Sequence, residues 1–536
     1  MKLPQNEIDR FGSAGFASAR EIAAAGMFTK GPNSLLIGFF GKRPLYWNGA
    51  GGLLLTAGAR GGKLKDVLAY NVCSGTFANN LVTLDMKGEL AAISQDQTPD
   101  RKHCIYWNPA FLHKLPRHRI NPVDYIRIDS PSLVSDVKVF CENMISLTGS
   151  ANAVYFEGRG REFLEAIILT LVRVDGVLTL PRLYQSINLL PGGGERWLNF
   201  AFEMSEAGFE ISKRIEEEIA ASREREGNGF QGIIGEIFKA FACLSDPSLM
   251  ASVSPPYDFS MRELCENDHI FQVYLMPPAE FIDAWAPVIK AILVAGMIYK
   301  ARAASAPPQT WILDECAQLN SFPLAVKLFT YGAGIGIRPW AIFQSTFQMN
   351  ALAPNAQNIT TSSAALRSYF ALRDIDSATA VSRMLGAQTL SYDDELRQAQ
   401  ARLAKHEALQ ALLNGGDPTA AGLKYAHHRR EAEHRAKQHR MLRTADEVLN
   451  TPPGKQYIFA DCLQNAIFGD RDAYYQQRFM AGCYHPNPYH PPLDKVQVRT
   501  WFGKSWRQII REPVPAEFAD YPQYASGYWS YVEKSK

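Results

Sequence analysis

Residues 53–72, LLLTAGARGGKLKDVLAYNV, form the stretch that predicts the fold of this chain. They begin with a short apolar run that suits a buried parallel strand, and apolar residues recur at helical spacing after Lys63. The turn between these two segments is rich in glycine, which permits a positive φ and a close approach of the backbone to a ligand. The order of strand, glycine-rich turn and helix is that of a phosphate-binding loop.

Lys63 lies at the centre of this candidate loop. A helix N-terminus presents unpaired N–H groups to an anion, and a lysine at this position reaches the β- and γ-phosphates. The loop departs from the pattern GxxxxGK[ST] because Ala57 replaces the first glycine and Leu64 replaces the hydroxyl that ligates Mg²⁺. An ordinary strand-to-helix turn with a surface lysine is the alternative. The predicted nucleotide-binding residues are Gly58, Ala59, Arg60, Gly61, Gly62, Lys63 and Leu64.

A second motif, TWILDE at residues 310–315, favours the nucleotide-binding interpretation. It is an apolar strand that ends in two acids, an arrangement in which Asp314 holds Mg²⁺ and Glu315 polarises the attacking water. The next predicted strand, residues 338–345, ends in Gln344, a candidate sensor of the γ-phosphate. A buried glutamine bonded to the backbone is the alternative for Gln344. Together the motifs predict hydrolysis of ATP with Mg²⁺.

Asp85 follows an earlier apolar strand in the sequence NLVTLDMKGEL, residues 80–90. It superficially resembles the acid of a Walker B strand. Because no second acid follows directly, we expect Asp85 to cap the following helix or to order a loop.

The distance between the two main motifs predicts an insertion. Lys63 and Asp314 are 251 positions apart, which is too far for one compact α/β unit. From about residue 131 to residue 254 the pattern changes to amphipathic helices. We therefore predict an N-terminal lead-in, a nucleotide-binding domain in two parts with an all-α domain inserted between them, and a C-terminal extension. The boundaries are 1–33 for the lead-in, 34–130 and 255–482 for the nucleotide-binding domain, 131–254 for the insertion and 483–536 for the extension.

Composition limits the possible functions. The 536 residues are 46% hydrophobic, which suffices for several cores, and 56 Lys and Arg nearly balance 54 Asp and Glu. Contact with nucleic acid must therefore be local. The cysteines have no metal-ligand spacing, so a reducing cytoplasm is the simplest compartment. We find no signal peptide and no apolar run near the roughly 20 residues that span a bilayer, so no transmembrane helix is expected.

These motifs together resemble the type IV coupling proteins of the TraG and TraD kind, the ATPases that hand DNA or effector proteins to conjugation and type IV secretion channels. The resemblance covers most of the chain and rests on the order and spacing of several segments. They are AGARGGKLKD at 57–66, LDMKGEL at 84–90, INPVD at 120–124, ILDECAQL at 312–319 and YGAGIGIRPWAIFQS at 331–345.

The resemblance implies an α/β fold, namely a RecA-type P-loop NTPase domain with an inserted all-α domain that recognises substrate. It implies ATP and Mg²⁺ as cofactors and a homohexamer with nucleotide bound between subunits. The implied partners are single- or double-stranded DNA bound without sequence specificity, relaxase or effector proteins, and components of the secretion channel. The family is usually anchored in the inner membrane, so without a transmembrane helix we expect a cytoplasmic protein at the periphery of that membrane.

The sequence does not identify which residue supplies the positive charge that stabilises the γ-phosphate during hydrolysis. Except for Arg60, no arginine lies within the loop or at the end of the acidic strand, so the γ-phosphate needs an arginine from a neighbouring subunit. Arg338 is the first candidate and Arg373 the second, with a structural salt bridge as the alternative for either. Two other functions remain open: a soluble hexameric DNA translocase of the FtsK and HerA kind, and a non-hydrolysing receptor for relaxase or effector complexes.

Overall fold

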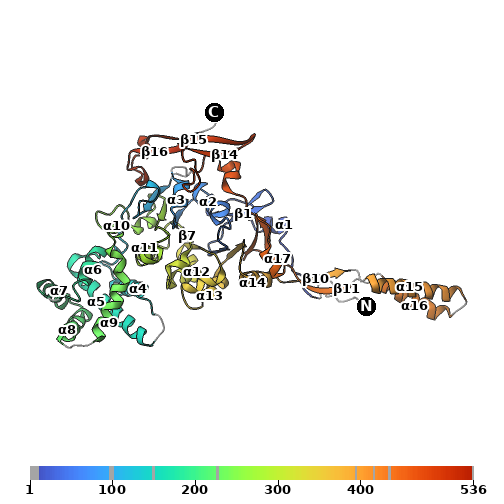
Figure 1. Ribbon diagram of the computed structural model, residues 1–536, viewed down its shortest axis with the longest axis horizontal. Coiled ribbons are helices and arrows are strands. Elements are labelled where there is room, and N and C mark those ends of the chain that lie inside the picture. Colours follow the sequence, from blue (N-terminus) through green and yellow to red (C-terminus); the bar gives the residue numbers. More distant parts are fainter. Residues whose placement is uncertain are drawn as a thin grey trace. The chain divides into compact units, whose positions relative to one another are not determined.

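A computed structural model describes residues 11–95, 102–147, 151–192, 194–224, 228–392, 395–414, 417–432 and 436–533. The first ten residues of the predicted lead-in lie outside this range. At the centre is a sheet of 11 strands in the order β2-β1-β13-β12-β9-β3-β8-β7-β4-β6-β5 (Figure 1). The strands are β1 Leu35–Phe40, β2 Arg43–Trp47, β3 Leu53–Ala57, β4 Asn80–Leu84, β5 His103–Trp107, β6 Phe271–Leu275, β7 Gln309–Asp314, β8 Ile337–Phe343, β9 Leu366–Phe370, β12 Lys455–Ala460 and β13 Ile467–Asp470.

The strands from β9 to β5 run parallel, and the strands beyond β9 add an antiparallel edge. Parallel strands are covered on both faces, which explains why β3, β4 and β6 are buried at every position. The strands predicted from the two main motifs are confirmed, whereas β5 was not predicted. Helices that connect these strands are α2 Ala69–Cys73, α3 Glu89–Ser94, α11 Ile282–Arg302, α12 Pro323–Ile335 and α13 Ala356–Ser363.

A group of helices interrupts the sheet between β5 and β6, which are neighbours in it. Its apolar faces pack together: Phe163 and Ile167 of the long helix α5, and Ile215 and Ile219 of α8, are fully buried. The expected helical insertion is therefore present (Figure 1). Its helices are α4 Leu133–Met144, α5 Ala151–Asp175, α6 Leu180–Ile187, α7 Glu195–Glu206, α8 Glu210–Glu224, α9 Asn228–Phe241 and α10 Pro247–Ser252.

Helix α11 has the length and apolar composition of a membrane span, and it alone does so in the part of the chain that the structure describes. In the fold, 72% of its most apolar segment is buried inside the protein. Its residues Trp285, Ile289 and Leu293 belong to the main hydrophobic core. The helix is thus explained as a core element that follows β6.

The described residues within 1–18, 373–452 and 463–467 form a second compact unit. The predicted boundaries place residues 1–18 in the lead-in and do not separate the other two segments from the nucleotide-binding domain. In its described part, β10 and β11 make an antiparallel ribbon, and α15 and α16 pack against each other between them in the chain. Its elements are α14 Ile375–Leu385, β10 Ala387–Tyr392, α15 Glu395–Leu413, α16 Pro418–Ala432, β11 Ala436–Met441 and α17 Ala445–Leu449.

The C-terminal extension belongs to the same unit as the large sheet and has a sheet of its own. This sheet is antiparallel and consists of β14 Lys495–Thr500, β15 Gly503–Pro513 and β16 Tyr528–Val532 (red in Figure 1). Val496, Val498 and Val532 are its buried residues. The extension, for which the sequence predicted no structure, is therefore an ordered part of the fold.

Candidate functional site

The candidate site lies where three adjacent parallel strands end. In the sheet, β8 lies between β3 and β7. The phosphate-binding loop follows β3, Gln344 follows β8, and Asp314 and Glu315 stand at the end of β7. Because the carboxyl ends of parallel strands share one edge of the sheet, this order brings Lys63 into contact with Glu315, 252 positions later in the chain.

The loop has the backbone that its glycines predict. Gly62 has φ 94° and Arg60 has φ 58°, both in the left-handed region. A Cβ at Gly62 would lie 2.3 Å from Asp66 Oδ2, and a Cβ at Gly61 would lie 2.8 Å from the carbonyl of Gly58. Glycine is therefore required at positions 61 and 62.

The helix after the loop begins differently from the expected α-helix. Its first turn, Leu64–Leu68, has π-helical hydrogen bonding and continues into α2. The N-terminal end of this helix, with the N–H groups that a phosphate can bind, follows Lys63 directly. Leu64 is half-buried and offers no hydroxyl.

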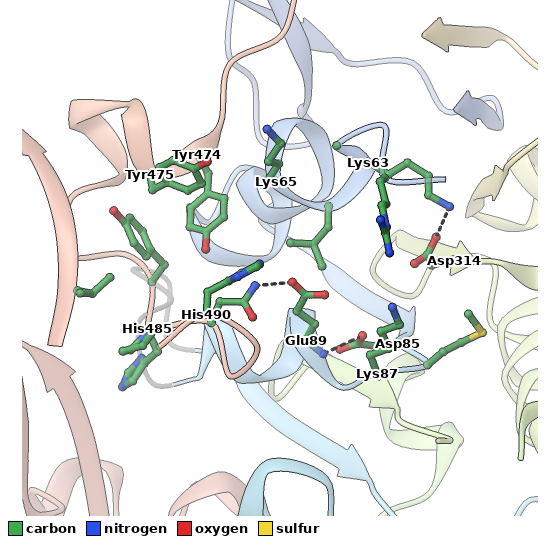
Figure 2. A pocket seen from close by; sticks show the side chains of 18 of the residues that line it. Lys63, Lys65, Asp85, Lys87, Glu89, Asp314, Tyr474, Tyr475, His485 and His490 are labelled. Carbon is green, nitrogen blue, oxygen red and sulfur yellow. Dashed lines mark hydrogen bonds and ion pairs between the residues drawn. The ribbon is translucent and has the colours of Figure 1, made fainter. Parts of the chain in front are cut away.

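The amino group of Lys63 contacts both acids of the second motif. Its Nζ donates to Glu315 Oε1 and lies 3.8 Å from Asp314 Oδ1 (Figure 2). Glu315 Oε1 also accepts a hydrogen bond of 2.9 Å from Nε2 of Gln344. Glu315 is therefore in direct contact with Lys63 and with Gln344, and these are three of the four residues predicted as catalytic.

Glu315 has an unusual backbone. Its φ of 53° is in the left-handed region, which few residues other than glycine adopt. The residue is 6% exposed, and its carboxylate is held by the two bonds described above. Such conformations cost on the order of 1–3 kcal/mol and cluster at functional sites.

Asp314 is suited to hold a cation. Its Oδ1 is buried and accepts no hydrogen bond from a described residue. Burial raises the pKa of Asp314 to about 6, against the opposing effect of Lys63 and with a further rise from Glu315. Burial disfavours the ionised form of a carboxyl group, and a nearby cation stabilises that form.

Asp85 lies beside this acid at the end of β4 and lines the same pocket. Its carboxylate accepts hydrogen bonds from the backbone N–H groups of Glu89, at 3.1 Å, and Ala91, at 2.8 Å. The expectation that Asp85 caps the following helix is confirmed. Burial raises the pKa of Asp85 to about 7, although the two backbone bonds lower it and the charge of Asp314 raises it further.

Arg338, predicted as a catalytic arginine that acts on the nucleotide of a neighbouring subunit, lies outside this chain's own site. It pairs with Thr310 at the amino end of β7, four residues or roughly 13 Å along the strand from Asp314. The side chain is 5% exposed. Its guanidinium donates to Thr310 Oγ1 at 3.1 Å, to the Gly49 carbonyl at 2.7 Å and to the Asn33 carbonyl at 2.8 Å. These contacts are structural. They hold the guanidinium of Arg338 at the edge of the sheet opposite to the one that carries Asp314.

A pocket of about 910 Å³ joins these groups. The predicted loop residues 59–64 line it, together with both acids and Gln344. Gly58 does not line it; its N–H bonds to the carbonyl of Ala371 and its carbonyl accepts from Gly61, so it shapes the turn.

Sequence reasoning missed one whole side of this pocket. That side consists of the pocket-lining side chains between residues 474 and 506, which we call the C-terminal wall. Figure 2 shows Tyr474, Tyr475 and His490 of this wall across the pocket from Lys63. The sequence signals that exist, prolines and aromatic residues in this segment, do not reveal that it folds back onto the loop.

Comparison with known proteins agrees with this geometry. The family model described as Type IV secretory system Conjugative DNA transfer matches residues 5–410. No curated protein sequence matches the chain.

Three similar solved structures are coupling proteins. One is the bacterial conjugative coupling protein TrwBdeltaN70 in an unbound form, with 15% identity and a TM-score of 0.59 over 86% of this chain and 97% of that chain. The plasmid coupling protein TrwB in complex with ADP and Mg²⁺ gives 16% identity and a TM-score of 0.56, over 86% of this chain and 96% of that one. TrwB in complex with the ATP analogue ADPNP gives 16% identity and a TM-score of 0.58, over 86% of this chain and 96% of that chain. These likenesses confirm the predicted fold class, a RecA-type P-loop NTPase domain with an inserted all-α domain.

Proposed function

Because this chain belongs to the type IV secretory system family of conjugative DNA transfer proteins, we propose that it is an ATP-hydrolysing coupling protein. It recruits DNA, protein or both and delivers them to a type IV secretion or conjugation channel. The observation that carries this proposal is the convergence of Lys63, Glu315 and Gln344 in one pocket, at the ends of three adjacent strands. The resemblance to coupling proteins inferred from the motifs is confirmed by the family match.

Each residue of the site has a distinct role in this proposal. The loop N–H groups and Lys63 bind the β- and γ-phosphates. Glu315 orients the attacking water and takes its proton, and Gln344, bonded to Glu315, reports the presence of the γ-phosphate through that bond. The charge on the transferred group is stabilised by position and electrostatics rather than by covalent chemistry.

The residues present fit a bound Mg²⁺. Oδ1 of Asp314, which is buried, accepts no hydrogen bond from a described residue and lies 3.8 Å from Lys63 Nζ, would be the protein ligand, and water would supply the others because Leu64 lacks a hydroxyl. When bound, Mg²⁺ neutralises charge on the phosphates. The proposed cofactors are accordingly ATP and Mg²⁺.

Binding of ATP has to separate a pair of charges. Lys63 donates to Glu315 in the structure, and both side chains are largely buried, at 13% and 7% exposed. A phosphate that bonds Lys63 competes with Glu315 and releases that carboxylate to bind water. The ion pair between Lys63 and Glu315 therefore couples the binding of phosphate at the loop to the release of Glu315 for its role as base.

The partners follow from the family and are part of the proposal. We infer DNA bound without sequence specificity, relaxase or effector proteins, channel components, and a homohexamer at the cytoplasmic side of the inner membrane. The nearly balanced charge of the chain, 56 basic against 54 acidic residues, requires that any DNA-binding surface be local.

Two variants test the proposed chemistry. Lys63→Ala removes a phosphate contact, so we expect its affinity for ATP to fall by about tenfold or more. Glu315→Gln keeps the shape of the side chain but loses the base, so we expect nearly normal binding and a turnover reduced roughly 10²-fold or more. The measurements are an equilibrium binding titration and an ATPase assay.

The same assay separates this proposal from its rivals. A Glu315→Gln protein with wild-type turnover means that Glu315 is not the base. A wild-type protein that binds ATP without hydrolysing it, even at high concentration with added DNA, favours the non-hydrolysing receptor instead.

A further inference from the structure

The C-terminal wall stands at the end of the pocket away from the site of hydrolysis. Lys63 and Asp314 mark the end that takes the γ-phosphate, and Tyr474, Tyr475 and His490 lie on the opposite side (Figure 2). A triphosphate that extends from Lys63 along the loop points its nucleoside away from Asp314. In the described pocket, that direction leads to the C-terminal wall.

The wall is fixed to the nucleotide-binding sheet by several hydrogen bonds. The N–H of His485 donates to the carbonyl of Ile93 at 2.8 Å, and the side chain of Asn487 donates to Glu89, both in α3. The hydroxyl of Tyr489 donates to the carbonyl of Lys87 at 3.3 Å. These contacts hold the wall in place beside the end of β4, so the wall is a preformed surface.

The chemistry of the wall differs from that of the loop. The loop supplies Arg60, Lys63 and Lys65 to the pocket, which suits phosphate. Of the described residues that line the wall, Lys495 alone carries a full charge, and the others are aromatic, proline, amide, valine or imidazole side chains. A neutral aromatic surface suits a base and a ribose better than it suits phosphate.

Two rings of the wall are available for stacking. Tyr475 is half-buried and Trp506 is 50% exposed, so neither residue is fully covered by the protein, and both line the pocket. The amino group of Lys495 lies 5.5 Å from the centre of the Trp506 ring. Aromatic rings of this kind stack on bases with little dependence on base identity.

We propose that the C-terminal wall is the nucleoside subsite of the pocket, in which Tyr475 and Trp506 contact the base of the nucleotide whose phosphates occupy the loop. The inference rests on the proposed function, because it takes ATP as the ligand. The family match ends at residue 410, so the wall lies outside the segment by which this chain is assigned to its family. The extension thereby acquires a role in nucleotide binding.

The test compares two ligands that differ by the nucleoside. Dissociation constants for ADP and for inorganic triphosphate, each with Mg²⁺, are measured for the full chain and for Tyr475→Ala and Trp506→Ala. The control is Trp501→Ala, since Trp501 lies in the turn between β14 and β15, is 81% exposed and does not line the pocket. We expect Tyr475→Ala or Trp506→Ala to raise the dissociation constant for ADP about tenfold and to leave that for triphosphate unchanged. Trp501→Ala should change neither dissociation constant.

The outcomes separate this inference from the function on which it rests. If the wild type binds ADP but neither wall variant weakens it, the subsite is refuted and the proposed function stands. If a variant weakens ADP and triphosphate equally, the wall acts through the loop or through folding, and the subsite is also refuted. A wild type that binds neither ligand overturns both proposals.

Discussion

Arg338 is the first residue of the strand predicted over 338–345, but a sequence motif does not say at which end of a sheet a side chain lies. Arg338 is the second residue of β8, whereas the site lies at the carboxyl end of β8, and the buried guanidinium donates to the carbonyls of Gly49 and Asn33. Burial lowers the pKa of Arg338 to about 9, as expected for a cation without a carboxylate partner among its bonds.

We predict that Arg338→Ala destabilises the protein without removing catalysis. The change leaves two buried carbonyls without their donors and opens a cavity, which costs roughly 2–4 kcal/mol of unfolding free energy. Urea denaturation measures that loss, and the ATPase rate is measured at a temperature where the variant is folded. Normal stability combined with lost turnover would restore Arg338 as the catalytic arginine.

Arg471 is a residue that sequence reasoning did not single out. It is 6% exposed, and its Nη1 donates to the carbonyl of Gly61 at 3.0 Å and to Asp66 Oδ2 at 2.8 Å. Its guanidinium lies 3.7 Å from the centre of the Phe370 ring. It thus supports both the turn and the first turn of the helix of the phosphate-binding loop, from 405 positions away.

We predict that Arg471 positions the loop. Arg471→Ala should raise the KM for ATP about tenfold and change kcat little, because the loop loses its support while Glu315 stays in place. Arg471→Lys should restore part of the affinity, since it keeps the charge opposite Asp66. Arg478→Ala, in an exposed arginine that stacks on Trp501, is the control. An equal fall in kcat for Arg471→Ala would contradict a positioning role.

At the scale of elements, the strands around the site were predictable and the C-terminal extension was not. β3, β7 and β8 are nearly continuous apolar runs with polar residues at their ends, and that local pattern is enough to predict a buried parallel strand. β15 alternates between half-buried and exposed residues, so its sequence carries no comparable signal. The place of the extension beside the pocket depends on contacts of Asn487 and Tyr489 with residues about 400 positions earlier, which no local pattern encodes.

The extension also protects the outermost strand of the sheet. β5 has a free edge, and Gln523 covers it: its Oε1 accepts from the N–H of Cys104 and its Nε2 donates to the carbonyl of Lys102, both at 2.9 Å. The ring of His103 lies between those of His269 and Tyr521, with centroids 4.1 Å and 4.2 Å away. An uncovered edge strand would invite pairing with another chain.

This arrangement predicts that acid removes the stability contributed by the buried histidines. Burial lowers the pKa of His103 to about 4 and that of His485 to about 3, against about 6.5 in the unfolded chain. Below pH 6.5 each histidine binds more proton in the unfolded state, so each lowers the free energy of unfolding as the pH falls from about 6.5 towards 4. Asp85 and Asp314, whose pKa values burial raises to about 7 and about 6, act in the opposite direction over the same range. Urea titrations at pH 7.5 and pH 5 therefore compare the wild type with His103→Gln. The free energy of unfolding of the variant should fall less, or rise more, than that of the wild type, and an equal change in both would contradict the role of His103.

At the scale of the whole molecule, we expect the proposed site to need a group from a second chain. Arg60 is the sole arginine among the described residues that line the pocket, and the proposal assigns Lys63 to the bound phosphates. The charge that develops on the γ-phosphate therefore calls for a cation from a neighbouring subunit, as the proposed hexamer supplies. Because Arg338 is buried at the other edge of the sheet, we expect a different residue to provide it.

We predict that hydrolysis depends on assembly, so that specific activity rises with protein concentration and with added DNA. Lys63→Ala subunits bind nucleotide poorly but keep every arginine. Added in excess to wild-type protein that has been diluted until its activity is lost, they should restore turnover at the wild-type sites. An equal excess of albumin controls for crowding. Specific activity that stays constant on dilution, as judged by an ATPase assay alongside light scattering, would show that a single chain contains the complete site.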